Sequence, residues 1–195
     1  MKIDKPKDDE DILVVKACLR GEIESFTRLI EKYQNMIYNL CYRLTGGSKD
    51  AEDLAQETFV NAYRHLKNFD IEKKFFTWIY TIALNLCRDR MRRKKIDKYS
   101  IDAPLRTNED LYLQISSGEM SPEDIALCRE EEARIQKCIT ALPYKYRQVV
   151  LLRHQQGLSY EEIAQVTGKS LYTIKVWLHR ARKKLNGLFK EAGLE

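Results

Sequence analysis

The stretch that most constrains the fold is residues 50–95, because its apolar side chains recur with the period of a helix and do not alternate as in a strand. In its first half they recur at steps of three and four, which predicts an amphipathic helix. These residues are Ala51, Leu54, Ala55, Thr58, Phe59, Ala62, Tyr63 and Leu66. The opposite face is mostly acidic and carries Glu52, Asp53, Gln56 and Glu57. This helix is expected to bury one face and to present an acidic face outward.

The second half of the stretch is first aromatic and then basic. Phe75, Phe76, Trp78 and Tyr80 fall within six residues, and residues 88–95 hold six Lys or Arg and one acid. Four aromatic side chains so close together cannot all face one core, so at least one is expected to be exposed. Stacking groups beside cations suit a melted nucleic-acid strand. The acidic helix face cannot bind phosphate and is expected to contact a protein.

The segments around this stretch complete one helical domain, expected over residues 10–95. Apolar residues at positions 26–44 form a long helical stripe. Gly46 ends it, because glycine accepts the left-handed conformation of a helix C-cap. Ser48 is then expected to cap the acidic helix, and residues 68–74 to form the loop before the aromatic helix.

Helical periodicity fails after Lys95 and returns only at Ser121. Residues 96–120 contain a proline and scattered acids, which predicts a flexible acidic linker. A second domain is expected over residues 121–195. It opens with Ser121 as N-cap and Pro122 at the first helical position.

The C-terminal segment has the spacing of a helix-turn-helix. Ser159 and Glu162 have capping-box spacing, Gly168 ends that helix, and Ser170 caps the next. The buried stripe of the last helix is Ile174, Leu178, Ala181 and Leu185. The residues left on its outer side are Tyr172, Lys175, Val176, His179 and Arg180. With no strand pattern anywhere, the predicted fold class is all-α: two small helical domains joined by a flexible acidic linker.

Composition excludes several classes of protein. A hydrophobic content of 44% supports real cores, and the segregation of charge along a chain of net charge +5 predicts at least two kinds of partner. No signal peptide or membrane-spanning run is present, so a soluble, cytoplasmic protein without membrane insertion is expected. The cysteines lack metal-ligand spacing and are expected to be buried as small hydrophobes; they are Cys18, Cys41, Cys87, Cys128 and Cys138. The three histidines lie far apart in the sequence, and no phosphate-binding loop occurs. We therefore expect no metal, no cofactor and no enzymatic activity.

Two segments carry a family resemblance. DAEDLAQETFVNAYRHL, with the FTWIYTIALNLCRDRMRRKK that follows, resembles region 2 of bacterial sigma-70 family sigma factors, and of the extracytoplasmic-function (ECF) group above all. ALPYKYRQVVLLRHQQGLSYEEIAQVTGKSLYTIKVWLHRARKKL resembles region 4 of the same group. The resemblance implies a region 2 domain at residues 1–95 and a region 4 domain at residues 121–195, joined by the linker.

The resemblance also implies partners and site residues. Core RNA polymerase would bind the acidic helix face through Asp53, Gln56 and Glu57. The −10 promoter element would be bound and melted by Asn68, Phe69, Lys73, Trp78, Tyr80, Asn85, Arg88 and Arg92. The −35 element would be bound by Ser170, Tyr172, Thr173, Lys175, Val176, His179, Arg180 and Lys183. Many members also bind an anti-sigma factor, and the linker would thread near the active cleft of the polymerase.

The last helix departs from the family pattern at two places. Leu171 and Tyr172 replace small residues, and Trp177 stands where arginine is frequent. Without that arginine one phosphate contact is expected to be missing. The Trp177 side chain is expected to pack either at the edge of the core or against a sugar. The expected function is that of an alternative sigma factor, which binds core polymerase, recognises the −35 and −10 elements and promotes melting. The alternative is a conventional helix-turn-helix regulator that binds an operator. The promoter consensus, the inducing signal and the identity of any anti-sigma factor leave no mark in the sequence.

Overall fold

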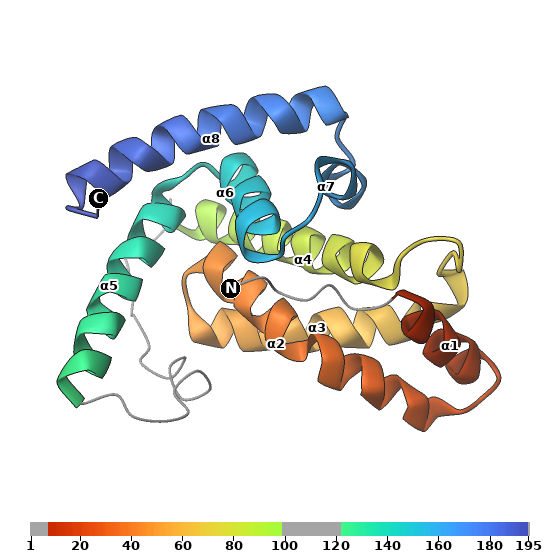
Figure 1. The fold of residues 1–195 in the computed structure, drawn as a ribbon. Helices are drawn as coiled ribbons and strands as arrows, with labels where there is room; N and C mark the ends of the chain where they lie inside the picture. The colour runs from red at the N-terminus through yellow and green to blue at the C-terminus, as the bar shows by residue number, and fades with distance from the viewer. Residues whose placement is uncertain (1–7, 99–121, 195) are drawn as a thin grey trace.

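The computed structural model describes residues 8–98 and 122–194, and every regular element in these ranges is a helix (Figure 1). The first part contains α1 (Asp8–Leu19), η1 (Ile23–Ser25), α2 (Phe26–Thr45), α3 (Ser48–Arg64), η2 (Leu66–Asn68) and α4 (Phe75–Lys98). The second contains α5 (Pro122–Ala141), α6 (Tyr144–Val150), the π-helical turn η4 (Leu151–Gln155), α7 (Tyr160–Thr167) and α8 (Leu171–Glu191). The predicted all-α class is confirmed. The predicted linker lies almost wholly outside the described residues.

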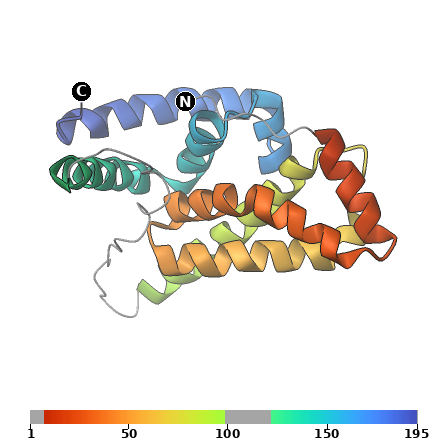
Figure 2. The same ribbon diagram turned by 60° about the horizontal axis from the view of Figure 1, so that its bottom comes forward.

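Helices α2, α3 and α4 lie side by side and enclose the core of the first part (Figures 1 and 2). The predicted stripe of α2 is buried, with Tyr33 and Ile37 fully inaccessible to solvent. Gly46 ends this helix in the left-handed conformation with φ at 79°, as predicted. Ser48, however, is not the cap of α3: Gly47 takes the N-cap position in an extended conformation, and Ser48 is the first helical residue.

The local signals of the second part are confirmed. The backbone N–H of Glu162 donates to Ser159 Oγ at 3.1 Å, and the N–H of Ser159 donates to Glu162 Oε2 at 2.8 Å, which completes the capping box. Gly168 ends α7 with φ at 64°, and Ser170 Oγ caps α8 by accepting from the N–H of Thr173. Helices α7 and α8 are therefore the predicted helix-turn-helix.

The two parts pack against each other and share one core. Leu152 and Ile163 of the second part belong to the same buried cluster as Phe75 of the first. Arg147 of α6 donates from Nη1 to the carbonyl of Leu44 at the end of α2. Helix α7 packs against α4 and lies next to it in both ribbon views. The sequence did not predict this contact, because the two segments are separated by the linker.

The cysteines are not all buried, which corrects the expectation. Cys41 and Cys87 are buried with their sulfur atoms 3.6 Å apart. The hydrogen bond between these thiols, with burial, raises the pKa of Cys87 and keeps it a neutral thiol. Cys18 is partly exposed and Cys128 is exposed. Cys128 is exposed because it lies in the N-terminal half of α5, where the neighbouring Leu127 also keeps 65% of its surface accessible.

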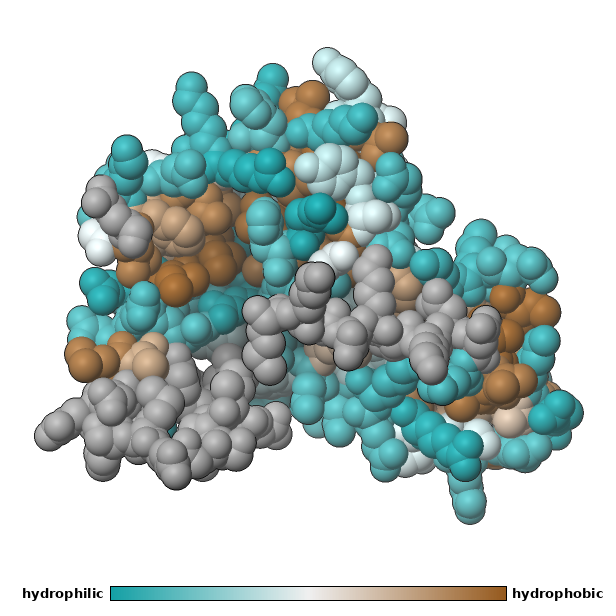
Figure 3. Space-filling model, viewed as in Figure 1, coloured by the Kyte–Doolittle hydropathy of each residue, from teal (hydrophilic) through white to brown (hydrophobic). Residues whose placement is uncertain are grey.

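The surface is hydrophilic over most of the view in Figure 3. Hydrophobic side chains gather at the upper left of that view, where α5, α6 and α8 meet, and at the right over α1. No helix of the described residues is long and apolar enough to cross a membrane. The described part of the chain also contains no group of three or more His, Cys, Asp or Glu side chains able to hold a metal ion.

Candidate nucleic-acid and protein interfaces

The acidic face of α3 is exposed, with Asp53, Gln56 and Glu57 all open to solvent. Asp50, at the start of the same helix, behaves differently. Its carboxylate accepts from Arg90 Nη1 at 2.8 Å and also from Lys94 Nζ, so it is occupied by the basic end of α4. The three exposed side chains thus form an acidic and polar surface separate from these ion pairs.

The loop between α3 and α4 is held by an aromatic cluster. The ring of Phe69 lies 5.0 Å from that of Trp78 and 5.7 Å from that of Phe75. Phe69 is buried and Trp78 is only partly exposed, so these rings support the loop from beneath. Asn68 and Lys73 are exposed on it, and Lys73 forms an ion pair with Asp70 at 3.4 Å. The loop therefore presents polar side chains on a rigid apolar base.

The predicted exposed aromatic residue is not found in this arrangement. Phe75, Phe76 and Tyr80 are all buried, and Trp78 keeps partial exposure. The prediction considered only the first part of the chain, whereas α4 has two covered faces: α2 and α3 cover one, and α7 covers the other. The Tyr80 hydroxyl donates to Gln156 Oε1 at 2.5 Å, and burial raises the pKa of Tyr80, so it remains a protonated donor.

Beyond this covered segment, α4 exposes cations. Arg88 Nη2 donates to Asn85 Oδ1 at 2.8 Å, and both side chains are exposed. Arg92 is exposed as well and lies 3.8 Å from the carboxylate of Asp89. Because Arg90 is engaged with Asp50, the outward positive charge of this helix comes from Arg88 and Arg92 together with the exposed Arg93.

Helix α8 presents a second basic surface. Tyr172 is 78% exposed, and Lys175, His179, Arg180 and Lys183 are also exposed. The remaining predicted −35 residues are Ser170, which is exposed, and Thr173 and Val176, which are partly exposed. Trp177 is partly buried against the core, which confirms one of the two interpretations of this departure.

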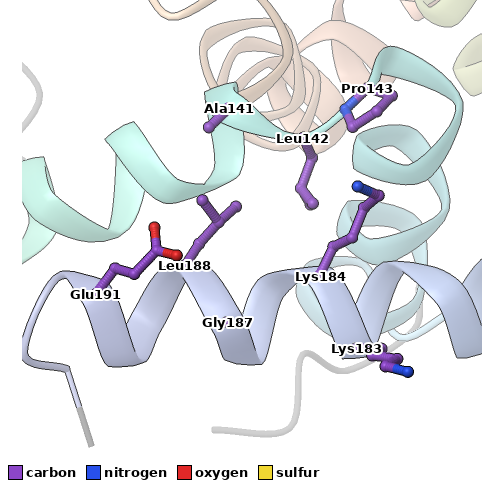
Figure 4. A pocket seen from close by; sticks show the side chains of 8 residues that line it. All are labelled: Ala141, Leu142, Pro143, Lys183, Lys184, Gly187, Leu188 and Glu191. Atoms are coloured by element: carbon purple, nitrogen blue, oxygen red, sulfur yellow. The ribbon is translucent and has the colours of Figure 1, made fainter.

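Lys183 and Lys184 lie on different sides of α8 (Figure 4). Lys184 extends toward Leu142 and Pro143 across an open hollow of about 280 Å³ between the α5–α6 turn and the C-terminal half of α8. Lys183 points away from this hollow. The two adjacent lysines therefore cannot make equivalent contacts with one DNA backbone.

Three residues of the α4–helix-turn-helix contact were not singled out as functional by sequence reasoning. Lys74 Nζ lies 3.2 Å from Glu162 Oε1, and Gln156 accepts the bond from Tyr80. Glu162 had a complete local explanation as the partner of Ser159 in the capping box. Tyr80 and Gln156 are 76 residues apart in the sequence. A local sequence pattern does not predict a contact between side chains at such a separation.

These features define a class of protein. An exposed cationic face on the second helix of a helix-turn-helix is the arrangement that places side chains in a DNA groove. The exposed cations of α4, on the helix that follows the aromatic-supported loop, and a separate acidic surface suited to a protein partner add two further interfaces. The chain is thus a transcription factor with more than one macromolecular partner.

Comparisons with known proteins agree with this class. Residues 29–96 match the family model of sigma-70 region 2, and residues 132–185 match that of sigma-70 region 4. The chain is 40% identical to the ECF RNA polymerase sigma factor SigW of Bacillus subtilis over 88% of this chain and 92% of that protein. It is 34% identical to the RNA polymerase sigma-H factor of Pseudomonas aeruginosa, over 94% of this chain and 98% of that protein.

Solved structures show the same fold. CnrH, in complex with the cytosolic domain of CnrY, superposes with a TM-score of 0.69 at 24% identity over 93% of this chain and 97% of that one. RpoE in complex with the anti-sigma factor NepR, from Bartonella quintana, gives a TM-score of 0.68 at 23% identity over 86% of this chain and 98% of that one. The chain belongs to the ECF group of sigma-70 family RNA polymerase sigma factors. It is an alternative sigma factor for transcription initiation, and its partners are core RNA polymerase and promoter DNA.

Proposed function

We propose that each interface serves one step of initiation. The acidic face of α3, through Asp53, Gln56 and Glu57, docks on a basic surface of core RNA polymerase. Its exposure and its separation from the ion pairs of Asp50 support this role, because the three side chains need not break another contact to bind. The region 2 domain would span residues 1–95, the linker residues 96–120, and the region 4 domain residues 121–195.

The loop after α3 and the outward face of α4 capture the melted −10 strand. Asn68 and Lys73 stand on the loop, Asn85 and Arg88 are joined on the helix, and Arg92 follows one turn later. In this role Phe69 and Trp78 hold the loop from beneath. Tyr80 is available to DNA only once it leaves Gln156.

The exposed face of α8 reads the −35 element. Lys175 and Arg180 can each donate to guanine O6 and N7, and the partly exposed Val176 can contact a thymine methyl group. Tyr172 and His179 flank these positions. Ser170 and Thr173 stay in the N-cap of the helix and fix its first turn against the DNA backbone.

Two further expectations belong to this proposal. An anti-sigma factor regulates the chain, in the way that RpoE of Bartonella quintana is bound by the anti-sigma factor NepR. The linker acts by charge and position, so a neutral tether of equal length would keep core binding and alter early RNA synthesis in an abortive-transcript assay. Unchanged promoter escape would leave the linker a plain tether.

The protein does no covalent chemistry of its own, because polymerase makes the RNA, and it acts in the cytoplasm, where polymerase and promoter DNA are. It needs no cofactor. Sigma factors are non-enzymatic regulators of transcription, and we expect the same of this chain.

The observation that carries the proposal is the exposed, hydrogen-bonded Asn85–Arg88 pair on α4. We expect Asn85→Ala to leave core binding intact and to reduce open-complex formation on duplex promoter DNA, with recovery on a pre-melted bubble. Gln34→Ala, at an exposed position of α2, is the matched control. Normal opening of duplex DNA by Asn85→Ala would place the −10 site elsewhere.

A further inference from the structure

Asp50 joins the first turn of α3 to the basic end of α4. Its carboxylate accepts from Arg90 Nη1 at 2.8 Å and, through the other oxygen, from Lys94 Nζ. We propose that Asp50 determines specificity for the −10 strand by masking these two cations, which would otherwise bind phosphates of any sequence. Asp50 is a positioning residue, because it acts on DNA only through the cations that it holds. This inference rests on the proposed role of α4 in −10 binding.

The polar side chains at the end of α4 lie on two sides of the helix. Arg90 and Lys94 are one turn apart on the side that faces α3. At about 100° per residue, Asn85, Arg88 and Arg92 lie on roughly the opposite side. A strand bound along this outer side therefore lies across the helix from the two masked cations.

The mask is part of the packing between α3 and α4. The Asp50 side chain is 13% exposed, whereas that of Asp89, which pairs with Arg92 along the same helix, is 48% exposed. Asp50 lies in the first turn of α3, where the helix dipole favours a carboxylate. Arg90 and Lys94 keep 32% and 49% of their side-chain exposure, so both can reach DNA once the carboxylate no longer holds them.

Removing the carboxylate would create a second binding track on α4. Arg93 is already exposed between the two masked positions, so Arg90, Arg93 and Lys94 would then offer three cations within about one turn. Cations bind phosphates whatever the base sequence. A strand without the −10 sequence could bind this track, whereas a −10 strand held on the outer side gains little from it. Discrimination would therefore fall because the wrong strand binds better.

Four variants isolate the mask. Asp50→Asn removes the charge and keeps the size of the side chain, and Asp50→Glu keeps the charge as the conservative rescue. Glu52→Gln changes the net charge equally at an exposed position roughly across α3, and is the matched control. A triple variant adds Arg90→Gln and Lys94→Gln to Asp50→Asn. Because the cations of these ion pairs are partly exposed, Tm should change by about 4 °C or less in each variant.

The test uses holoenzyme reconstituted from core polymerase and the full-length chain, so that polymerase contributes equally to every variant. Fluorescence anisotropy measures the binding of two single strands of equal length and composition. One carries the −10 sequence selected in reconstituted transcription, and the other is scrambled. Each titration is repeated between about 0.05 and 0.3 M salt, because the slope with salt counts the phosphates that are neutralised.

We expect Asp50→Asn to bind the scrambled strand about three- to tenfold more tightly at low salt, and the −10 strand less than about twofold more tightly. The salt slope for the scrambled strand should steepen by about 0.7–1.4, as expected for one or two further phosphates. Asp50→Glu, Glu52→Gln and the triple variant should bind both strands like the wild type.

Three results would overturn the mask. The first is no gain on the scrambled strand, and the second is a gain that persists in the triple variant or is equal in Glu52→Gln. The third is a loss of −10 strand affinity with a lower Tm and an unchanged salt slope, which would make Asp50 a structural support alone.

Asn85→Ala separates this proposal from the proposed function. It should also reduce discrimination, but by weakening the −10 strand while the scrambled strand binds as before. If Asn85→Ala binds both strands like the wild type, α4 is not the −10 reader. The specificity role of Asp50 then fails with the proposed function, even where Asp50→Asn unmasks the two cations.

Discussion

Arg147 offers the sharpest test of how the two parts of the chain are held together. Arg147 is 5% exposed, and its Nη1 and Nη2 atoms donate to backbone carbonyls. Nη1 donates to Leu44, and Nη2 donates to Thr140 and, at 3.1 Å, to Leu142. Burial lowers the pKa of Arg147, but arginine remains charged, so the three carbonyls offset the cost of burying a cation.

Replacing Arg147 by Met removes these bonds while filling much of the space. Three buried carbonyls lose a charged donor, at roughly 1 kcal/mol or more each, and the relief of a buried charge recovers part of this. We expect a net loss of about 2–4 kcal/mol in the free energy of unfolding. For a chain of this size that corresponds to a fall in Tm of about 4–16 °C.

Urea unfolding followed by tryptophan fluorescence measures this loss. Trp78 reports on the first part of the chain and Trp177 on the second, so single-tryptophan variants show whether both parts unfold together. The control is Arg134→Met, at an exposed position of α5. A loss below about 1 kcal/mol for Arg147→Met, equal to that of Arg134→Met, would refute the argument that this guanidinium stabilises the fold through its three carbonyl acceptors.

Three further predictions follow from exposure and geometry. Asp53→Lys should weaken binding to core polymerase in a pull-down with little change in thermal stability, because an exposed charge contributes little to folding; wild-type affinity would argue against α3 as the docking surface. Lys183→Ala should reduce −35 DNA affinity for all sequences and lower the salt dependence, whereas Lys184→Ala, on the other side of α8, should change both less in a salt titration. In native protein a thiol reagent should modify Cys128 first and the buried cysteines only on unfolding; fast modification of three or more thiols would contradict the described burial.

Much of the local structure could be predicted from sequence because its causes are local. The left-handed glycine at Gly46, the capping box of Ser159 and Glu162, and the buried stripe through Ile174 each depend on residues within one or two turns. The position of Ser48 was missed by one residue, because Gly47 can take the extended N-cap conformation equally well.

The contacts between the two parts of the chain, on either side of the linker, could not be predicted from the sequence. Tyr80 was predicted to support DNA melting from its place beside cations, and the structure buries it against Gln156. Cys128 was predicted to be buried from its apolar neighbours, but the start of α5 extends past the core. Both differences arise because burial depends on which elements meet in space, and helical periodicity within one segment does not determine this.

The most direct test of the central claim is a reconstituted transcription selection with core polymerase and promoters randomised at both elements. The account predicts two conserved blocks, one near −35 and one near −10. Lys175→Ala should relax only the −35 block, and Asn85→Ala only the −10 block. A single block selected equally well without polymerase would contradict the account and favour a conventional operator-binding regulator, and unchanged blocks with both variants would remove α8 and α4 as the readers.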